Sequence, residues 1–139
     1  LDLDEIGVIN YEITLLNKGM IAEQFIAQEL YVGSFQRNRI KNYYWLRDKK
    51  TQNAEVDFVI ELDDKIIPVE VKAGKSGSIK SLLYFMLEKK SLTNLAMRFD
   101  LKHRSNIQEN ITFHEAQFKM ISIPLYLISQ YKKILTSFK

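Results

Sequence analysis

Two runs of alternating apolar and polar residues, Glu55–Leu62 and Lys65–Ala73, constrain the fold more than any other part of the sequence. A period of two residues is typical of strands that are buried on one face. Only Asp63-Asp64 separates the two runs. Because a two-residue connection joins antiparallel strands, the sequence predicts a β-hairpin at the centre of the chain.

A two-residue loop also predicts the register of this hairpin. It sets Phe58 opposite Val69 and Val56 opposite Val71. These four side chains then share one apolar face, which we expect to pack on the core. A loop of odd length would break this pairing, because a shift by one residue moves every side chain to the other face.

The opposite face of the predicted hairpin is charged. In the same register Asp57 lies opposite Glu70, and Glu55 lies opposite Lys72. Opposed side chains are about 5 Å apart, where two ionised carboxylates repel by roughly 3 kcal/mol at an effective dielectric constant of about 20. A divalent cation or a shared proton removes this repulsion, and oxygen ligands favour Mg²⁺ or Mn²⁺. The alternative is a solvated face that carries a weak surface ion pair.

The spacing of Glu70 and Lys72 is weak evidence when it is taken alone. An acid two residues before a lysine recurs along the chain in four other pairs: Asp48/Lys50, Asp63/Lys65, Glu88/Lys90 and Asp100/Lys102. Glu70/Lys72 differs from these pairs because it lies inside an apolar strand with a second acid predicted opposite. We therefore place the candidate chemistry at this pair.

The rest of the chain predicts helices and further strands around the hairpin. Apolar residues recur at helical spacing over Gly19–Tyr31. A second helix is predicted over Ser78–Lys90 with Ser78 as its N-cap, and a third begins at Pro124. The order of elements predicts the α/β class, with a central mixed sheet flanked by helices. The additional strands are expected at Asn42–Arg47, at Leu95–Phe99 and, as one or two short strands, within Ile111–Ile121.

Composition excludes several kinds of chemistry. The 139 residues include no cysteine, which excludes disulfides, thiolate zinc sites and cysteine nucleophiles, and a reducing cytoplasm is the expected location. No apolar run approaches the roughly 20 residues of a membrane helix. The GxxxxGK[ST] and HExxH motifs are absent, and His103 and His114 lack ligand spacing. Residues 1–17 are expected to be a leader that ends a preceding segment, and residues 18–139 one domain.

Basic and hydroxyl residues after the hairpin are candidates for binding nucleic acid. Lys75, Ser76, Ser78 and Lys80 lead into the second predicted helix, where hydroxyls and backbone N–H groups are expected to hold a DNA phosphate. The alternative is a solvated loop with an N-cap. The run Tyr43–Trp45 could stack on bases, but aromatic strand residues more often belong to a core. The net charge of +3 with a pI of about 9.0 is mildly basic.

The segments Glu55–Val59 and Ile67–Gly74 resemble the core of the PD-(D/E)xK nuclease superfamily, which has the restriction-endonuclease-like fold. The superfamily's proline before the aspartate is Val56 here. More narrowly, the chain resembles the C-terminal domain of unknown function that is found on many prokaryotic AAA-type ATPases. The further matching segments are Lys18–Glu23, Tyr43–Trp45, Lys80–Leu82 and Ile123–Tyr126.

The resemblance implies a restriction-endonuclease-like core with a Mg²⁺ or Mn²⁺ site. Asp57 and Glu70 would hold the metal, and Glu23 on the first helix would add a further ligand. Lys72 would orient or deprotonate the attacking water. The implied function is metal-dependent hydrolysis of phosphodiester bonds in DNA, in a domain accessory to an AAA-type ATPase region expected before Leu1.

Two alternatives to the enzyme remain open. The same fold could be an inactive module that binds DNA or a partner for the ATPase, which the mild positive charge favours. A purely structural interaction domain would leave the acid pair unexplained. Glu23 has its own alternative, because a half-buried helix acid is more often a salt-bridge partner than a metal ligand.

Overall fold

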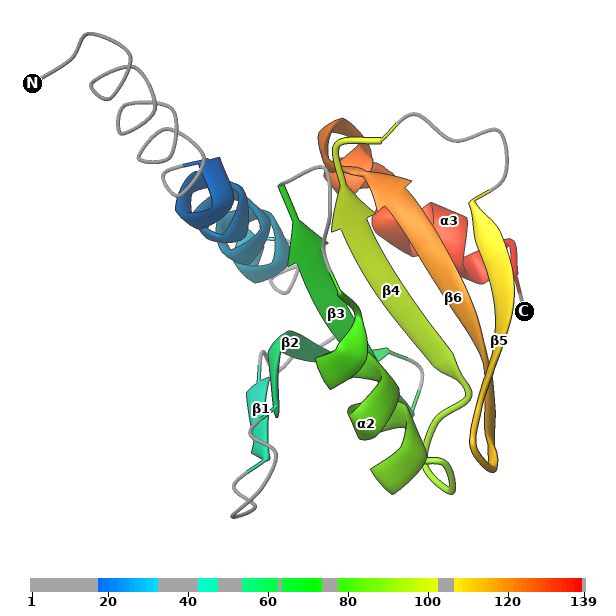
Figure 1. The fold of residues 1–139 in the computed structure, drawn as a ribbon. Coiled ribbons are helices and arrows are strands. Elements are labelled where there is room, and N and C mark those ends of the chain that lie inside the picture. The colour runs from blue at the N-terminus through cyan, green and yellow to red at the C-terminus, as the bar shows by residue number, and fades with distance from the viewer. Residues whose placement is uncertain are drawn as a thin grey trace, which may run out of the picture.

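The computed structural model describes residues 18–32, 43–47, 54–62, 64–73, 78–102 and 107–138. Within these ranges a six-stranded sheet is flanked by helices (Figure 1). The predicted first helix is present over residues 18–32. The other elements are β1 (Tyr43–Arg47), β2 (Ala54–Leu62), β3 (Lys65–Lys72), α2 (Lys80–Glu88), β4 (Leu95–Asp100), β5 (Gln108–Phe113), β6 (Ala116–Pro124), the 3₁₀ helix η1 (Leu125–Gln130) and α3 (Tyr131–Thr136).

The sheet is mixed, with the strand order β1-β2-β3-β4-β6-β5. β1, β2 and β3 are antiparallel neighbours, β3, β4 and β6 run parallel, and β5 pairs antiparallel with β6 at the edge. The parallel step from β3 to β4 requires a crossover connection, which α2 provides. The predicted α/β class, with a mixed sheet between helices, is confirmed.

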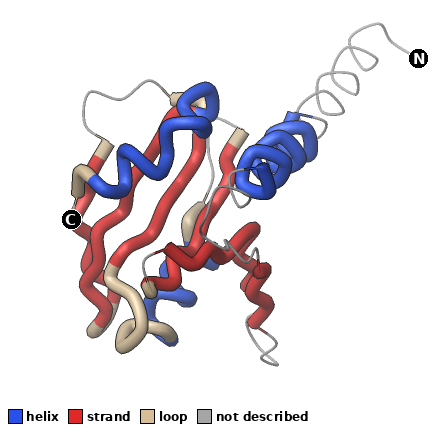
Figure 2. Tube along the Cα trace, turned by 180° about the vertical axis from the view of Figure 1, so that it is seen from behind, coloured by secondary structure: helices blue, strands red, loops and turns tan. Residues whose placement is uncertain are grey.

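Two apolar cores lie on opposite faces of the sheet. The first packs the helix of residues 18–32, η1 and α3 against one face, and the second packs α2 against the other. Figure 2 shows the first face, with the C-terminal helices in front of the strands and the helix of residues 18–32 beside them. None of the helices in the described ranges is long and apolar enough to cross a membrane.

The register of the β2–β3 hairpin is confirmed over most of its length. The ladder runs from Phe58 opposite Val69 to Leu62 opposite Lys65. Asp64, between these strands, has a φ of 62°, which aspartate tolerates better than most residues. The predicted pairs of Asp57 with Glu70 and of Glu55 with Lys72 lie beyond the end of this ladder.

A β-bulge explains why the ladder ends there. β1 pairs Tyr43 with Val59 and Trp45 with Val56, which leaves Asp57 and Phe58 of β2 opposite one residue of β1. The extra residue breaks the alternation once. Val56 and Val59 therefore both lie in the core under α2, while Phe58 packs on the opposite core. The prediction that Val56 shares a face with Phe58 and Val71 was wrong for this reason.

Three other boundaries differ from the predictions. The N-cap of α2 is Ile79, and Ser78 Oγ instead accepts the N–H of Lys80 at 3.1 Å. Pro124 ends β6 and precedes η1, rather than starting a continuous α-helix. The ambiguous Ile111–Ile121 stretch forms parts of β5 and β6, with His114 at a φ of 52° in the connection between them.

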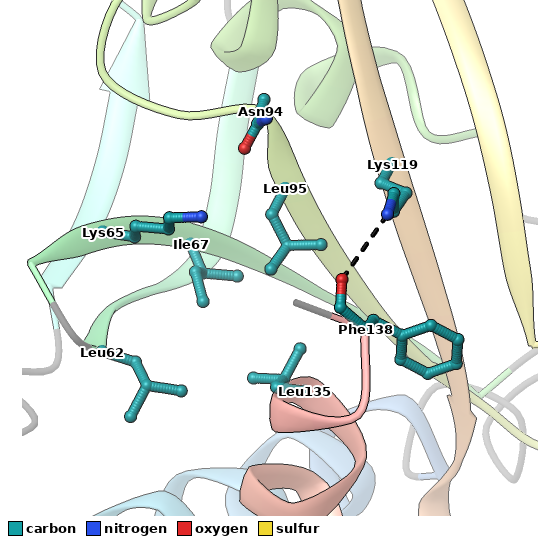
Figure 3. Close-up of a pocket in the computed structure, with 8 residues that line it drawn as sticks. All are labelled: Leu62, Lys65, Ile67, Asn94, Leu95, Lys119, Leu135 and Phe138. Atoms are coloured by element: carbon teal, nitrogen blue, oxygen red, sulfur yellow. Dashed lines mark hydrogen bonds between the residues drawn. The ribbon is translucent and has the colours of Figure 1, made fainter.

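The described part of the chain includes two cavities. One, of about 210 Å³, opens near the start of β3, with Lys65 and Lys119 beside an apolar wall that includes Leu135 (Figure 3). Lys119 Nζ donates to the carbonyl of Phe138 at 3.5 Å. The other, of about 380 Å³, lies between β2 and the end of α2, beside Trp45. Neither cavity is lined by Asp57, Glu70 or Lys72.

The first helix offers a matched test of the fold. Leu30 is 0% exposed in the first core, whereas Ile21 on the same helix is 63% exposed. We expect Leu30→Ala to lower the free energy of unfolding by about 2–5 kcal/mol, because it leaves a cavity. Ile21→Ala should change it by less than about 0.5 kcal/mol. Urea unfolding followed by circular dichroism measures both. Equal effects would contradict the packing of this helix on the sheet.

Candidate metal centre

Asp57 is held in the gap where β2 and β3 part. Its Oδ2 accepts the backbone N–H of Val71 at 2.7 Å. Strand N–H groups point along the plane of the sheet toward the neighbouring strand. The carboxylate therefore takes the place of a backbone acceptor of β2. The bulge places Asp57 here, because the regular β2–β3 ladder ends at Phe58 and Val69, one pair before Asp57.

Glu70 lies on β3 between two core residues, Val69 and Val71, and is itself 3% exposed. Its Oε1 forms an ion pair with the ammonium of Lys72. Its Oε2 is buried and has no hydrogen-bond partner in the described part of the structure. A buried charged group without a full set of partners is costly, so this oxygen marks a place where a proton or a cation is stabilising.

Burial raises the pKa of Glu70 to about 7, against the opposing effect of the Lys72 hydrogen bond. The negative charges of Asp57 and Glu23 raise it further. The pKa of Asp57 is also raised, first by burial, while the N–H of Val71 acts in the opposite direction. Two carboxyls with raised pKa values in one charged group are typical of a functional site.

Glu23 reaches this group from the helix of residues 18–32. Its side chain is exposed, yet desolvation and the charge of Asp57 raise its pKa, and Lys72 lowers it. Glu55 contributes to the same field, because its charge raises the pKa of both Glu23 and Asp57. The structure thus brings the three predicted acids and Lys72 into one electrostatically coupled group.

The donor set fits a hard divalent cation that keeps part of its water shell. The described residues contain no group of three or more His, Cys, Asp or Glu side chains arranged to hold a metal. Mg²⁺ is commonly bound through one or two carboxylates, with water and substrate phosphate as its other ligands. Asp57 and the orphaned Oε2 of Glu70 meet that requirement, and Glu23 lies farther out as an exposed acid.

The predicted nucleic-acid residues are described only in part. Lys75 and Ser76 lie outside the described residues. Ser78 and Lys80 are exposed at the start of α2. Trp45 is half-buried and packs edge-on against Phe85 at 5.3 Å between ring centroids, which assigns its ring to the core rather than to base stacking. The side chains of Tyr43 and Tyr44 lie outside what the structure describes.

A second buried polar group was not predicted from the sequence. Arg98 and Asp100 on β4 are joined by an ion pair of 3.3 Å between Nε and Oδ2. Arg98 Nη2 also donates to Oγ of Ser122 on β6 at 3.0 Å. The signal available in the sequence was the pair of charges at alternate positions inside the apolar run Leu95–Asp100.

Comparison with protein families gives one match. A family model described as a domain of unknown function, DUF4143, matches residues 18–126. This range includes the helix of residues 18–32 and all strands of the described sheet, and it contains Asp57, Glu70 and Lys72. A search of curated proteins gives no match.

The raised pKa of Glu70 predicts that stability depends on pH. Between the ordinary value of 4.5 and about 7 the folded state holds a proton that the unfolded state has lost. The free energy of unfolding should therefore fall as pH rises through this window, by on the order of 3 kcal/mol. Glu70→Gln, which mimics the protonated carboxyl, should remove most of this dependence. Urea unfolding from pH 4.5 to 7.5 without metal tests it, and an unchanged slope in Glu70→Gln would contradict the assignment.

Proposed function

The chain belongs to the DUF4143 family, a domain of unknown function, and we propose that it is a metal-dependent nuclease of the PD-(D/E)xK type. Its reaction would be Mg²⁺-dependent hydrolysis of phosphodiester bonds in DNA. The single observation that carries this proposal is the buried, unpartnered Oε2 of Glu70, in the same charged group as Asp57 and Lys72. A divalent cation is the ligand that satisfies such an oxygen and offsets its charge.

Asp57 and Glu70 would hold the metal. When bound, Mg²⁺ would polarise the phosphate and lower the pKa of an attacking water. Asp57 is well fixed for this role, because the N–H of Val71 holds one oxygen and leaves the other available. Glu23 would act from the first helix, as an outer acid that holds a water or neutralises the cation.

Lys72 would act on the substrate rather than on the metal. It is on the same strand face as Glu70, two residues further on, and its side chain is 28% exposed, so solvent and substrate can reach it. Its ammonium now pairs with Glu70. With that carboxylate engaged by a cation, the ammonium would be free to orient water or to bind a non-bridging phosphate oxygen. Such a positive charge stabilises the transition state more than the ground state.

The setting of this reaction is also part of the proposal. The segment around Asp57 and Glu70-Val71-Lys72 resembles the domain that follows the ATPase region in prokaryotic AAA-type proteins, and a nuclease there would act on DNA that the ATPase delivers. Val56, at the superfamily's proline position, is fully buried under α2 and fills an apolar site.

A second function, an inactive binding module with the same fold, has one observation in its favour. The Glu70–Lys72 ion pair already neutralises one charge of each sign without a metal. In that case the site would hold DNA or a partner of the ATPase and would not cleave it. The two functions differ in what Lys72 contributes, because a binder uses it for affinity and an enzyme uses it for rate.

We expect Lys72→Ala to lower the rate of DNA cleavage in Mg²⁺ by about a hundredfold or more, the loss of one preorganised charged group. Cleavage of plasmid and of single-stranded DNA measures this effect. Lys65→Ala is the matched control, because Lys65 is an exposed lysine at the other end of β3. Thermal melting should show that both variants are folded.

The same variants separate the enzyme from the binder. In a binder, Lys72→Ala should weaken DNA affinity and lower its salt dependence by about one phosphate contact. Wild-type protein that cleaves neither DNA nor RNA with Mg²⁺ or Mn²⁺, alone or joined to its ATPase region, would end the nuclease proposal.

A further inference from the structure

The polar group on β4 and β6 is continuous with the candidate metal centre. In the parallel ladders Glu70 is paired with Arg98, and Arg98 with Ser122. The next row pairs Lys72 with Asp100. Because paired residues in a sheet project to the same side, these five residues form two polar rows on one face, at the carboxyl ends of three parallel strands.

These rows interrupt a face that is otherwise apolar. Two residues earlier on the same strands, Ala96 and Met120 are buried under α2 in an apolar core. The polar rows begin where that core ends. Ser122 and Asp100 are 1% and 3% exposed, so the rows are not a solvated surface. The side chain of Arg98, at 13% exposure, is the more accessible part of its pair with Asp100.

Arg98 is held in a fixed orientation. Its Nε faces Asp100 at 3.3 Å and its Nη2 faces Ser122 at 3.0 Å. Asp100 is fixed in turn, because its Oδ1 accepts the N–H of Lys102 at 3.1 Å. A guanidinium held by two neighbours is preorganised, so little conformational entropy is lost when it binds an anion.

A contribution to the stability of the fold is a weak explanation for the Arg98–Asp100 ion pair. Burying two charges costs several kcal/mol in desolvation, and apolar residues of similar size in this position would stabilise a fold as well or better. A planar guanidinium is the group that best matches the oxygens of a phosphate. Arg98 lies one strand, about 4.8 Å, from the strand that carries Glu70 and Lys72.

We propose that Arg98, oriented by Asp100 and Ser122, is a phosphate-binding residue that holds the nucleic acid strand beside the phosphate at the Glu70–Lys72 centre. This proposal rests on the proposed function for the identity of the substrate. It assigns the carboxyl ends of β4 and β6 to substrate binding. The strand would then run across the sheet from β3 toward β6.

The test removes the guanidinium without leaving a buried charge. Replacing Arg98 alone would leave the carboxylate of Asp100 buried without its cation. The variant is therefore the double substitution Arg98→Met/Asp100→Leu. Binding of a fluorescein-labelled single-stranded DNA oligonucleotide is measured by anisotropy in EDTA over a range of salt concentrations. We expect at least a fivefold loss of affinity at low salt, and a salt-dependence slope reduced by about 0.7, the value for one phosphate contact.

A matched control makes the same change in charge elsewhere. Lys90 and Glu115 form an exposed ion pair of 3.1 Å, between the residues after α2 and the connection of β5 to β6. Lys90→Met/Glu115→Leu also removes one cation and one anion, and it should leave affinity and slope at the wild-type values. Arg98→Lys keeps the charge but not the planar fork, so it should retain part of the affinity.

The outcomes test the phosphate-binding role of Arg98 separately from the proposed nuclease activity. If the folded Arg98→Met/Asp100→Leu variant binds the oligonucleotide with wild-type affinity and slope, or if the wild type does not bind it, the phosphate-binding role is overturned. Cleavage by wild type together with unchanged binding by this variant leaves the nuclease standing without the Arg98 subsite. Arg98-dependent binding without any cleavage leaves the subsite standing and overturns the nuclease.

Discussion

The hydrogen bond from the N–H of Val71 to Oδ2 of Asp57 is the interaction on which the site depends. It joins β2 to β3 at the point where their backbone ladder has ended, and it does so at 2.7 Å through a side chain. The bulge in β2 makes this possible, because the extra residue aims Asp57 into the gap between the strands. Without the bulge, a regular ladder would use the N–H of Val71 for backbone pairing and leave the carboxylate on a sheet face.

The burial of Glu70 determines how readily its carboxyl group ionises. Its neighbours on β3 are core residues, so the carboxyl lies in a medium of low dielectric constant beside other acids. In the absence of metal, the ion pair with Lys72 and a pKa of about 7 limit the cost of its charge. Under the proposed function a divalent cation would stabilise the same arrangement, because it would satisfy Oε2 and offset the repulsion from Asp57.

The sequence predicted the parts of the fold that follow from periodicity and turn length. The α/β class, the first helix and the register from Phe58 to Leu62 could be predicted, because alternation and a two-residue connection leave few other pairings. The bulge could not, since Val56-Asp57-Phe58 continues the alternation without interruption. The bulge lies in the pairing with β1, which the alternation within β2 does not specify.

Sequence reasoning singled out the candidate residues that lie on one hairpin. Asp57, Glu70 and Lys72 stood out because charges inside apolar strands are costly and therefore informative. Asp100 is buried and Arg98 is half-buried, but a role for this pair depends on which strand lies beside β4. Parallel pairing of β3 with β4, across the α2 crossover, aligns Arg98 with Glu70. No local pattern in the sequence specifies that alignment.

The most direct test of the account is a crystal of the protein soaked in Mn²⁺ and measured near the manganese absorption edge. The account predicts an anomalous difference peak within about 2.5 Å of carboxylate oxygens of both Asp57 and Glu70. The peak should vanish in crystals of Asp57→Asn soaked in the same way. Crystals that show no peak at these carboxylates, or a peak that persists unchanged in Asp57→Asn, would contradict the assignment of a metal centre to the end of this hairpin.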